Sequence, residues 1–280
     1  MRGIFATGVL DQFLSVGFNP FHLAIGVSAG ATTAASWVAG MAGRSYRVFT
    51  EFSSGKEFIN PWRFLRGGHL MDLDWLWDTS IRELPFDLNA YEESPVTFLV
   101  GVTRVADGTP QYVKPNRENI ADVLKASSAM PLFYRSWVEL TLPDSEAART
   151  TSPVREAFAD GGLSDPIPAE EAYRRGAERI LVVRSRPRDY EMRPSRQMKM
   201  VARSLRKKLA LQHTLLDRPQ RYNRTIQFIR NPPAGVHIIE VNPPTDFETS
   251  RTTRDPAALE RDYQRGREAG AAAITRWNRI

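Results

Sequence analysis

One short segment constrains the fold of this chain more than any other: residues 23–30, which read Leu-Ala-Ile-Gly-Val-Ser-Ala-Gly. An apolar run that leads into Gly-x-Ser-x-Gly and then into a helix of small residues is typical of a nucleophile elbow. Gly26 and Gly30 stand two residues before and after Ser28, where the tight turn leaves space for little more than glycine. The helix start directs backbone N–H groups at any anion formed on Ser28, which suits acyl transfer. The alternative is a packing turn whose serine caps the helix.

A serine hydroxyl needs a base before it can act as a nucleophile, and the usual base is a histidine held by a carboxylate. None of the four histidines of the chain lies in a local catalytic motif: these are His22, His69, His213 and His237. A histidine in an apolar run, such as His237, is more often a core residue than a catalytic base. A Ser-His-Asp hydrolase that uses His213 or His237 stays open as an alternative.

Asp160 is the stronger candidate for a partner of Ser28. It ends the apolar run of residues 157–162, Ala-Phe-Ala-Asp-Gly-Gly. In a mostly parallel α/β sheet, functional groups gather beyond the carboxyl ends of the strands, so Ser28 and Asp160 are expected to meet there. Asp-Gly-Gly is also a common tight turn, which is the competing interpretation.

The two motifs together resemble those of the patatin-like phospholipases, whose serine nucleophile works with an aspartate and no histidine. Residues 1–11 resemble the end of the family's glycine-rich loop and the helix after it. Residues 126–134 resemble its Ala-Ser-x-Ala-x-Pro segment, and residues 165–183 resemble the stretch that follows its aspartate. The similarity extends from residue 1 to about residue 190 and more loosely to the end, and it is closest to bacterial single-domain members.

The resemblance implies a single patatin-like domain over residues 1–280 with a three-layer α/β/α fold and a mostly parallel central sheet. It implies an enzyme that hydrolyses esters of phospholipids or related acyl lipids through Ser28 and Asp160, with no cofactor and no metal. Backbone N–H groups near Gly3 and Ala29 would stabilise the oxyanion. The remaining motif residues are Arg2, Gly26, Gly30, Gly161 and Gly162.

The beginning of the chain departs from the family pattern. The family's glycine-rich loop follows a first, central strand, whereas this chain starts at Met1 with only the final Arg-Gly of that loop. Because the loss of a central strand would expose sheet edges, we expect the true start to lie upstream. The alternative is an incomplete oxyanion hole, and the loss of one donor lowers turnover by about 10²- to 10³-fold in other enzymes.

Composition sets broader limits. A chain of 280 residues suits one large α/β domain, and the absence of cysteine excludes disulfides and thiolate metal sites. No His-Glu-x-x-His pattern or carboxylate cluster predicts a metal site. The most apolar window, residues 18–38, is interrupted by glycines and hydroxyl side chains, so it predicts a buried strand and helix rather than a membrane span. No signal peptide precedes it, so we expect a cytoplasmic protein, peripheral to the membrane at most.

Two segments could bring the protein to a lipid surface. Residues 184–230 hold fourteen basic and three acidic residues, and residues 196–216 have helical spacing with an apolar side. Such a helix either contacts an anionic membrane or covers the core with its charges in water. No recognition motif accompanies the charge, so nucleic acid is not an expected partner. Residues 52–88 contain three of the six tryptophans, which favours either an aromatic cap over an acyl-binding cleft or two helices packed on the sheet.

Periodicity and turn residues place the remaining elements. Helices are expected at residues 4–15, 116–130, 169–175 and 256–276, and strands at residues 95–104, 111–114, 154–159, 180–183 and 235–241. Strands that alternate with helices indicate an α/β core.

Overall fold

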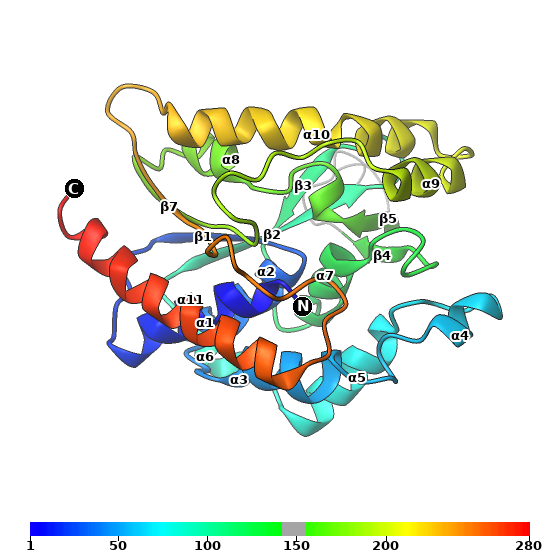
Figure 1. Cartoon of the computed structure of the whole chain (residues 1–280), viewed down its shortest axis with the longest axis horizontal. Coiled ribbons are helices and arrows are strands. Elements are labelled where there is room, and N and C mark those ends of the chain that lie inside the picture. The colour runs from blue at the N-terminus through cyan, green and yellow to red at the C-terminus, as the bar shows by residue number, and fades with distance from the viewer. Residues whose placement is uncertain (142–154) are drawn as a thin grey trace.

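A computed structural model describes residues 1–141 and 155–280 (Figure 1). The strands of these residues form a main sheet with the order β1-β2-β5-β4, in which β3 also pairs with β2, and a separate β6-β7 pair. The strands are β1 (Leu23–Val27), β2 (Thr97–Arg104), β3 (Pro110–Val113), β4 (Val138–Thr141), β5 (Arg155–Asp160), β6 (Arg179–Val183) and β7 (His237–Val241).

The α/β/α class is confirmed, but the strand directions are mixed. The β1–β2 and β6–β7 pairs are parallel, whereas β2–β3, β2–β5 and β4–β5 are antiparallel. The expectation of a mostly parallel sheet is therefore wrong. One cause is local: the turn at Asp107 and Gly108 folds β3 back along β2, with Gly108 at φ +73° and both the amide and the hydroxyl of Thr109 donating to Asp107.

Helices lie on both sides of the strands (Figure 1). One side carries α8 (Ala169–Arg174), α9 (Arg196–Ser204) and α10 (Leu209–Arg230), and the other carries α1 (Gly3–Ser15), α2 (Ala29–Val38) and α11 (Pro256–Trp277). Further helices are α3 (Arg44–Arg47), the π-helix η1 (Val48–Ser53), α4 (Pro61–Leu65), α5 (Leu73–Glu83), α6 (Leu88–Glu93), α7 (Ile120–Ser128) and the 3₁₀ turn η3 (Gly161–Leu163). The expected strand start at Val154 lies outside the described residues.

Helices α1 and α11 pack together closely enough to require glycine. A Cβ on Gly8 would lie 2.1 Å from the carbonyl oxygen of Tyr263, and a Cβ on Gly266 would lie 2.2 Å from that of Phe5. The last helix is thereby held against the first, and buried side chains of both helices belong to the main core. Both ends of the described chain therefore belong to one layer.

The basic segment forms two helices rather than one. Helix α9 ends at Ser204 and α10 begins at Leu209, so the expected continuous helix over residues 196–216 is wrong. Val201 and Leu205 are buried, but Leu209 is 62% exposed and does not join them. The break falls at the basic residues 206–208, all of which are exposed. Most of the apolar residues of α9 and α10 pack in the interior, as the second interpretation expected, whereas Met200, Leu209 and Leu216 are exposed.

The aromatic segment, residues 52–88, divides into a packed and an exposed part. Leu73 at the start of α5 is buried, whereas Trp62 and Leu65 on α4 are 72% and 74% exposed. The amides of Leu70 and Met71 both donate to the carbonyl of Phe133, in the segment before β4. Two helices are present, but α4 has no buried residue, so the expectation that both pack on the sheet is wrong for α4. The role of this segment as a cap stays a prediction.

No helix within the described ranges combines the length and the hydropathy that a bilayer crossing requires.

Candidate active site

Ser28 lies in the sharp turn between β1 and α2. Its backbone has φ +55° and ψ −129°, a conformation that residues other than glycine seldom adopt and that surrounding contacts must hold. A Cβ on Gly26 would lie 2.4 Å from the Cα of Ala31, so this position requires glycine. A Cβ on Gly30 would meet nothing within 4 Å, so the expected steric need for glycine is wrong there. Position 26, before the serine, thus has space only for glycine, whereas position 30, after it, has space for a side chain.

Ser28 and Asp160 are in direct contact. The hydroxyl of Ser28 donates to Oδ2 of Asp160 at 2.9 Å, and the amide of Gly162 donates to Oδ1 at 2.7 Å. Ser28 is half-buried and Asp160 is only 4% exposed. Each carboxylate oxygen therefore has a donor, and one of these donors is the hydroxyl at the elbow.

Strand β2 brings the two residues together. In the parallel β1–β2 pair, Val27 lies opposite Gly101, so Ser28 follows at the level of Val102. In the antiparallel β2–β5 pair, Val102 lies opposite Asp160 itself. The expected meeting beyond the carboxyl ends of parallel strands is wrong for Asp160, because β5 runs against β2. The shared neighbour on β2 accounts for the contact.

The aspartate turn approaches the middle of β2 closely. A Cβ on Gly161 would lie 2.1 Å from the carbonyl oxygen of Gly101, so glycine is required at position 161. The carbonyl of Asp160 accepts a hydrogen bond from the buried hydroxyl of Thr103 at 2.8 Å, and the amide of Asp160 donates to Ala129 at 3.0 Å. Backbone contacts to two different elements therefore hold the carboxylate in place.

Ser127 supports the elbow, although the sequence analysis did not identify it as a site residue. Its hydroxyl donates to the carbonyl of Gly101 at 2.7 Å and accepts from the amide of Ser28 at 2.8 Å. It is fully buried at the end of α7. A small hydroxyl residue in the Ala-Ser-x-Ala-x-Pro segment was the available signal, but its partners lie 26 and 99 residues away.

The starts of α1 and α2 lie side by side. A Cβ on Gly3 would come 3.0 Å from the Cβ of Ala29. The first N–H groups of a helix have no partner within that helix, so both starts offer free donors beside Ser28. Arg2, immediately before α1, is half-buried, and its pKa is lowered to about 10, chiefly by burial and then by the charge of Arg186.

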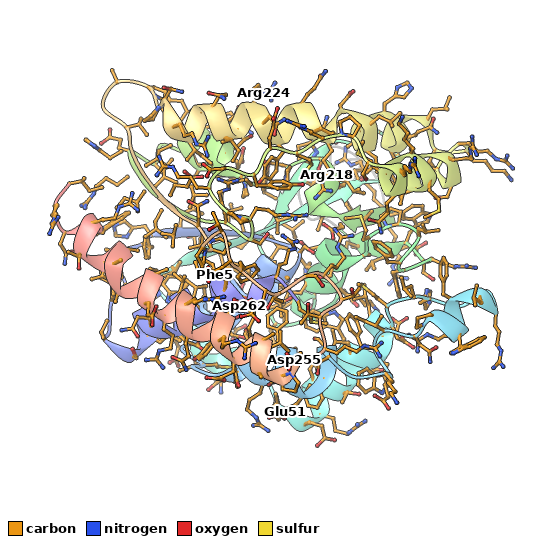
Figure 2. All side chains as sticks on the ribbon, viewed as in Figure 1. Phe5, Glu51, Arg218, Arg224, Asp255 and Asp262 are labelled. Atoms are coloured by element: carbon orange, nitrogen blue, oxygen red, sulfur yellow. The ribbon has the colours of Figure 1, made fainter. Side chains whose placement is uncertain are left out.

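The electrostatic balance at Asp160 sets a buried acid against nearby donors and cations. Burial raises the pKa of the Asp160 carboxyl, while the Gly162 amide and the cation of Arg218 oppose that rise. Burial in turn lowers the pKa of Arg218, and the Asp160 carboxylate opposes that shift. Nε of Arg218 donates to the carbonyl of Gly162. In Figure 2, Arg218 lies on the side of α10 that faces the strands, whereas Arg224 lies on its outer side.

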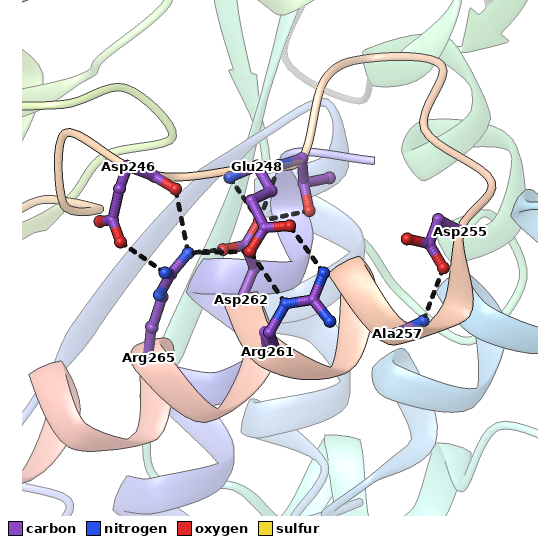
Figure 3. A network of polar contacts seen from close by, with 8 residues as sticks. Asp246, Glu248, Asp255, Ala257, Arg261, Asp262 and Arg265 are labelled. Carbon is purple, nitrogen blue, oxygen red and sulfur yellow. Dashed lines mark hydrogen bonds and ion pairs between the residues drawn. The ribbon is translucent and has the colours of Figure 1, made fainter.

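A second arginine approaches from the loop before α11. The positive charge of Arg251 also opposes the rise in the pKa of Asp160. The guanidinium carbon of Arg251 lies 5.2 Å from the ring centroid of Phe133. A polar network fastens this loop to α11 (Figure 3): the buried Asp262 accepts from the amides of Glu248 and Thr249 at 3.1 and 2.7 Å. The segment after β7 therefore contributes charge to the site.

The histidines lie elsewhere. His69 accepts from the amide of Arg135 at 2.9 Å and stacks on Tyr134, while His22, His213 and His237 are exposed. Within the residues that the structure describes, no histidine hydrogen-bonds to the Ser28 or Asp160 side chain. The geometry thus gives the Ser-His-Asp alternative no support.

Comparison with known proteins assigns the chain to a family. The model of the patatin-like phospholipase family matches residues 1–173, which include the elbow and the aspartate turn. A domain of unknown function (DUF6363) matches residues 209–280, which hold α10, β7 and α11. The chain is 35% identical over 273 residues to the uncharacterised protein YjjU of Escherichia coli K12, a match that covers 96% of this chain and 73% of that protein. The chain therefore belongs to the patatin-like phospholipase family, a family of lipid acyl hydrolases.

Proposed function

We propose that this chain cleaves ester bonds of phospholipids or related acyl lipids, with Ser28 as nucleophile and Asp160 as its base. The observation that carries the proposal is the 2.9 Å hydrogen bond from the Ser28 hydroxyl to the buried carboxylate, formed at a strained elbow. The family supports hydrolysis of acyl lipids in general. The dyad and the ester substrate are our inference from this geometry.

In the first half of the reaction, Oγ of Ser28 attacks the ester carbonyl carbon and its proton passes to Oδ2 of Asp160. The carbonyl oxygen becomes an oxyanion, and we expect the N–H groups of Gly3 and Ala29, which start two neighbouring helices, to stabilise it. Because burial raises the pKa of Asp160, the carboxylate is a stronger base than an exposed one. Collapse of the intermediate breaks the ester bond, and Asp160 returns the proton to the leaving alcohol.

In the second half, water attacks the acyl-serine and gives its proton to Asp160. A second oxyanion forms on the same N–H groups, and its collapse releases the carboxylic acid. The proton held by Asp160 returns to Oγ of Ser28, which restores the starting hydrogen bond. No other base is needed in either half of this cycle.

Contact with a lipid surface is the second part of the proposal. Trp62 and Leu65 lie three residues apart on α4 and are both largely exposed, next to the exposed basic residue Arg66. Apolar and basic side chains on one short projection suit the interface of an anionic membrane. We expect Trp62→Ser to weaken sedimentation with anionic vesicles severalfold while hydrolysis of a short, water-soluble ester is unchanged. Equal vesicle binding by both proteins would remove α4 from the proposal.

Labelling with a fluorescent fluorophosphonate tests the nucleophile directly. The wild-type chain should label, and Ser28→Ala and Asp160→Asn should not, because the first lacks the reacting oxygen and the second lacks the base. Ser128→Ala is the matched serine control and should leave labelling intact, since among the described residues the Ser128 hydroxyl bonds only to the carbonyl of Leu124.

The same assay separates the rival functions. His213→Ala and His237→Ala should retain full labelling, and its loss in either variant would favour a Ser-His-Asp hydrolase. Vesicle binding that persists in every variant, with no labelling and no hydrolysis even in the wild type, would instead indicate a lipid-binding protein.

A further inference from the structure

A cavity of about 290 Å³ lies outside the catalytic pair, between α2, α5, the turn at residues 85–88 and the first half of α7. Its size is near the lower end of the range of about 300–1,000 Å³ that is common for ligand sites. The walls are mainly apolar and include Ala35, Trp77, Ile81, Phe86, Ile120 and Leu124. A larger cavity of about 410 Å³ is lined by residues 232–239 and 276–280, so the elbow has no part in it.

The pocket runs beside the helix that begins at the nucleophile. Thr32 and Ala35 in its wall follow Ser28 by four and seven residues, so they share one side of α2 with it. Leu124 stands one turn before the end of α7, where Ser127 bonds the amide of Ser28. The near end of the pocket is therefore about one helical turn, roughly 5 Å, from the elbow.

Arg44 brings a buried positive charge to this pocket. It is 7% exposed, and its guanidinium carbon lies 5.3 Å from the ring centroid of Phe86. Its Nε donates to the carbonyl of Leu84 at 3.1 Å, and Nη1 reaches the hydroxyl of Ser36 at 3.5 Å. No carboxylate of residues 1–141 or 155–280 lies within 4 Å of it. Burial lowers the pKa of Arg44 to about 10, so the group is still charged at neutral pH.

A buried cation without an anion is costly. The fully buried Arg184 is paired with the carboxylate of Glu240. Arg44 has only a backbone carbonyl and a hydroxyl as neutral partners. The contrast indicates that an anion from outside the described residues belongs beside Arg44.

The pocket offers one charge and a second donor. Nε1 of Trp77 is buried with no partner in the described part of the chain, although its ring lines the cavity. Arg117, the other arginine of the wall, is already paired with Glu92 at 2.7 Å and is exposed at the rim. A ligand with one negative charge and an apolar body matches this set better than a phosphate dianion.

We propose that this pocket binds a monocarboxylate with an apolar chain, of the fatty acid class, with its carboxylate on Arg44 and its chain along α2 toward Thr32. The proposal goes beyond the hydrolase activity, because the occupant is the free acid and its binding does not involve Ser28. A fatty acid is also the acid that the proposed reaction releases. Binding of this product in the pocket would therefore couple the product concentration to α2, the helix that begins at the elbow.

Calorimetric titration of the Ser28→Ala protein with dodecanoate, below its micelle concentration, tests the proposal without turnover. We expect one site per chain. Arg44→Gln should weaken binding by about tenfold to a hundredfold, the effect of losing a charged hydrogen-bond partner. Dodecanol, which has the same chain but no charge, should bind more weakly and be insensitive to Arg44→Gln.

Two further variants keep the test decisive if Arg44→Gln does not fold. Ala121→Phe fills the pocket from α7 without removing a charge, and it should abolish binding of dodecanoate. Arg47→Gln removes the same charge from an exposed pair with Glu51, and it should bind dodecanoate as the parent does. Affinity for dodecanoate that is unchanged in both Arg44→Gln and Ala121→Phe would overturn the proposal, whether or not Ser28 proves to be the nucleophile.

Discussion

The aspartate turn and the Arg44 pocket each bury one charge, but they treat it differently. Around Asp160, both carboxylate oxygens accept hydrogen bonds from the chain, and Arg218 lies close enough to affect its pKa. Around Arg44, the described residues supply only neutral partners. A buried carboxylate that is hydrogen-bonded by the chain can exchange a proton with its own partner. A buried guanidinium without an anion favours the binding of a ligand that supplies a negative charge.

The largest effect is expected on turnover at Asp160. Asp160→Asn preserves the shape of the side chain but cannot take the proton of Ser28, so kcat for a short-chain ester should fall by about 10⁴-fold. Circular dichroism should show an unchanged fold, and Asp107→Asn in the exposed β2–β3 turn should retain wild-type kcat. A loss smaller than about tenfold would mean that Asp160 orients Ser28 without acting as its base.

Replacing each buried arginine tests whether the charge of Arg184 is balanced within the chain and that of Arg44 is not. Arg184→Met leaves the buried Glu240 with the Asn242 amide at 3.2 Å and a distant Arg230 at 3.8 Å, so the free energy of unfolding should drop by about 3–5 kcal/mol. Arg44→Met removes a charge that has no carboxylate partner, so the unliganded protein should change by less than about 1 kcal/mol. Urea denaturation at pH 7 measures both. Equal losses would show that Arg44 is balanced within the chain.

The close contact of the aspartate turn with β2 predicts that alanine substitutions at two glycines have opposite effects on the free energy of unfolding. Gly161→Ala places a methyl group against the carbonyl of Gly101, and it should lower the free energy of unfolding by about 1–3 kcal/mol. Gly30→Ala meets open space on a helix, and it should raise the free energy of unfolding by up to about 1 kcal/mol. The same denaturation series compares them, and the reverse order would contradict the packing described for the turn.

The smallest effect is a shift in pH dependence. Because the ionised Asp160 is the proposed base and burial raises its pKa, kcat/KM should fall as the pH drops through a value above the ordinary carboxyl range of about 4. The cation of Arg218 opposes that rise, so Arg218→Gln should move the acid limb to higher pH. Arg224→Gln on the outer side of α10 is the matched control. An acid limb of the kcat/KM profile that does not move in Arg218→Gln would show that Arg218 has no effect on the pKa of the catalytic base.

Local patterns were sufficient where a few adjacent residues decide the structure. The small residues around Ser28 predict a strand, a turn and a helix, and the apolar run before Asp160 predicts a strand that ends in a turn. Strand β4 was missed although Val138 and Leu140 alternate with exposed residues, which was a usable signal. The break between α9 and α10 was missed because helical spacing continues through the basic residues that interrupt the helix.

The parts of the site that escaped prediction depend on contacts between distant segments. Gly101 and Ser127 have no catalytic signature, and their roles follow from bonds to the elbow and close approach to the aspartate turn. Arg218 belongs to a basic segment whose charges mostly face water, so only the packing of α10 distinguishes it. Arg44 precedes the aromatic segment without any pattern of its own.

The sequence by itself determined the residues of the candidate site: a serine on an elbow that requires glycine at position 26, an aspartate at a strand end, and the family to which both belong. Those features depend on backbone sterics over a few residues, which a motif records directly. The tertiary structure alone decided that β5 runs against β2, that the two residues meet beside Val102, and that Arg44 is buried without a carboxylate. Strand register, burial and charge balance depend on contacts between segments far apart in the chain, so no single stretch of sequence determines them.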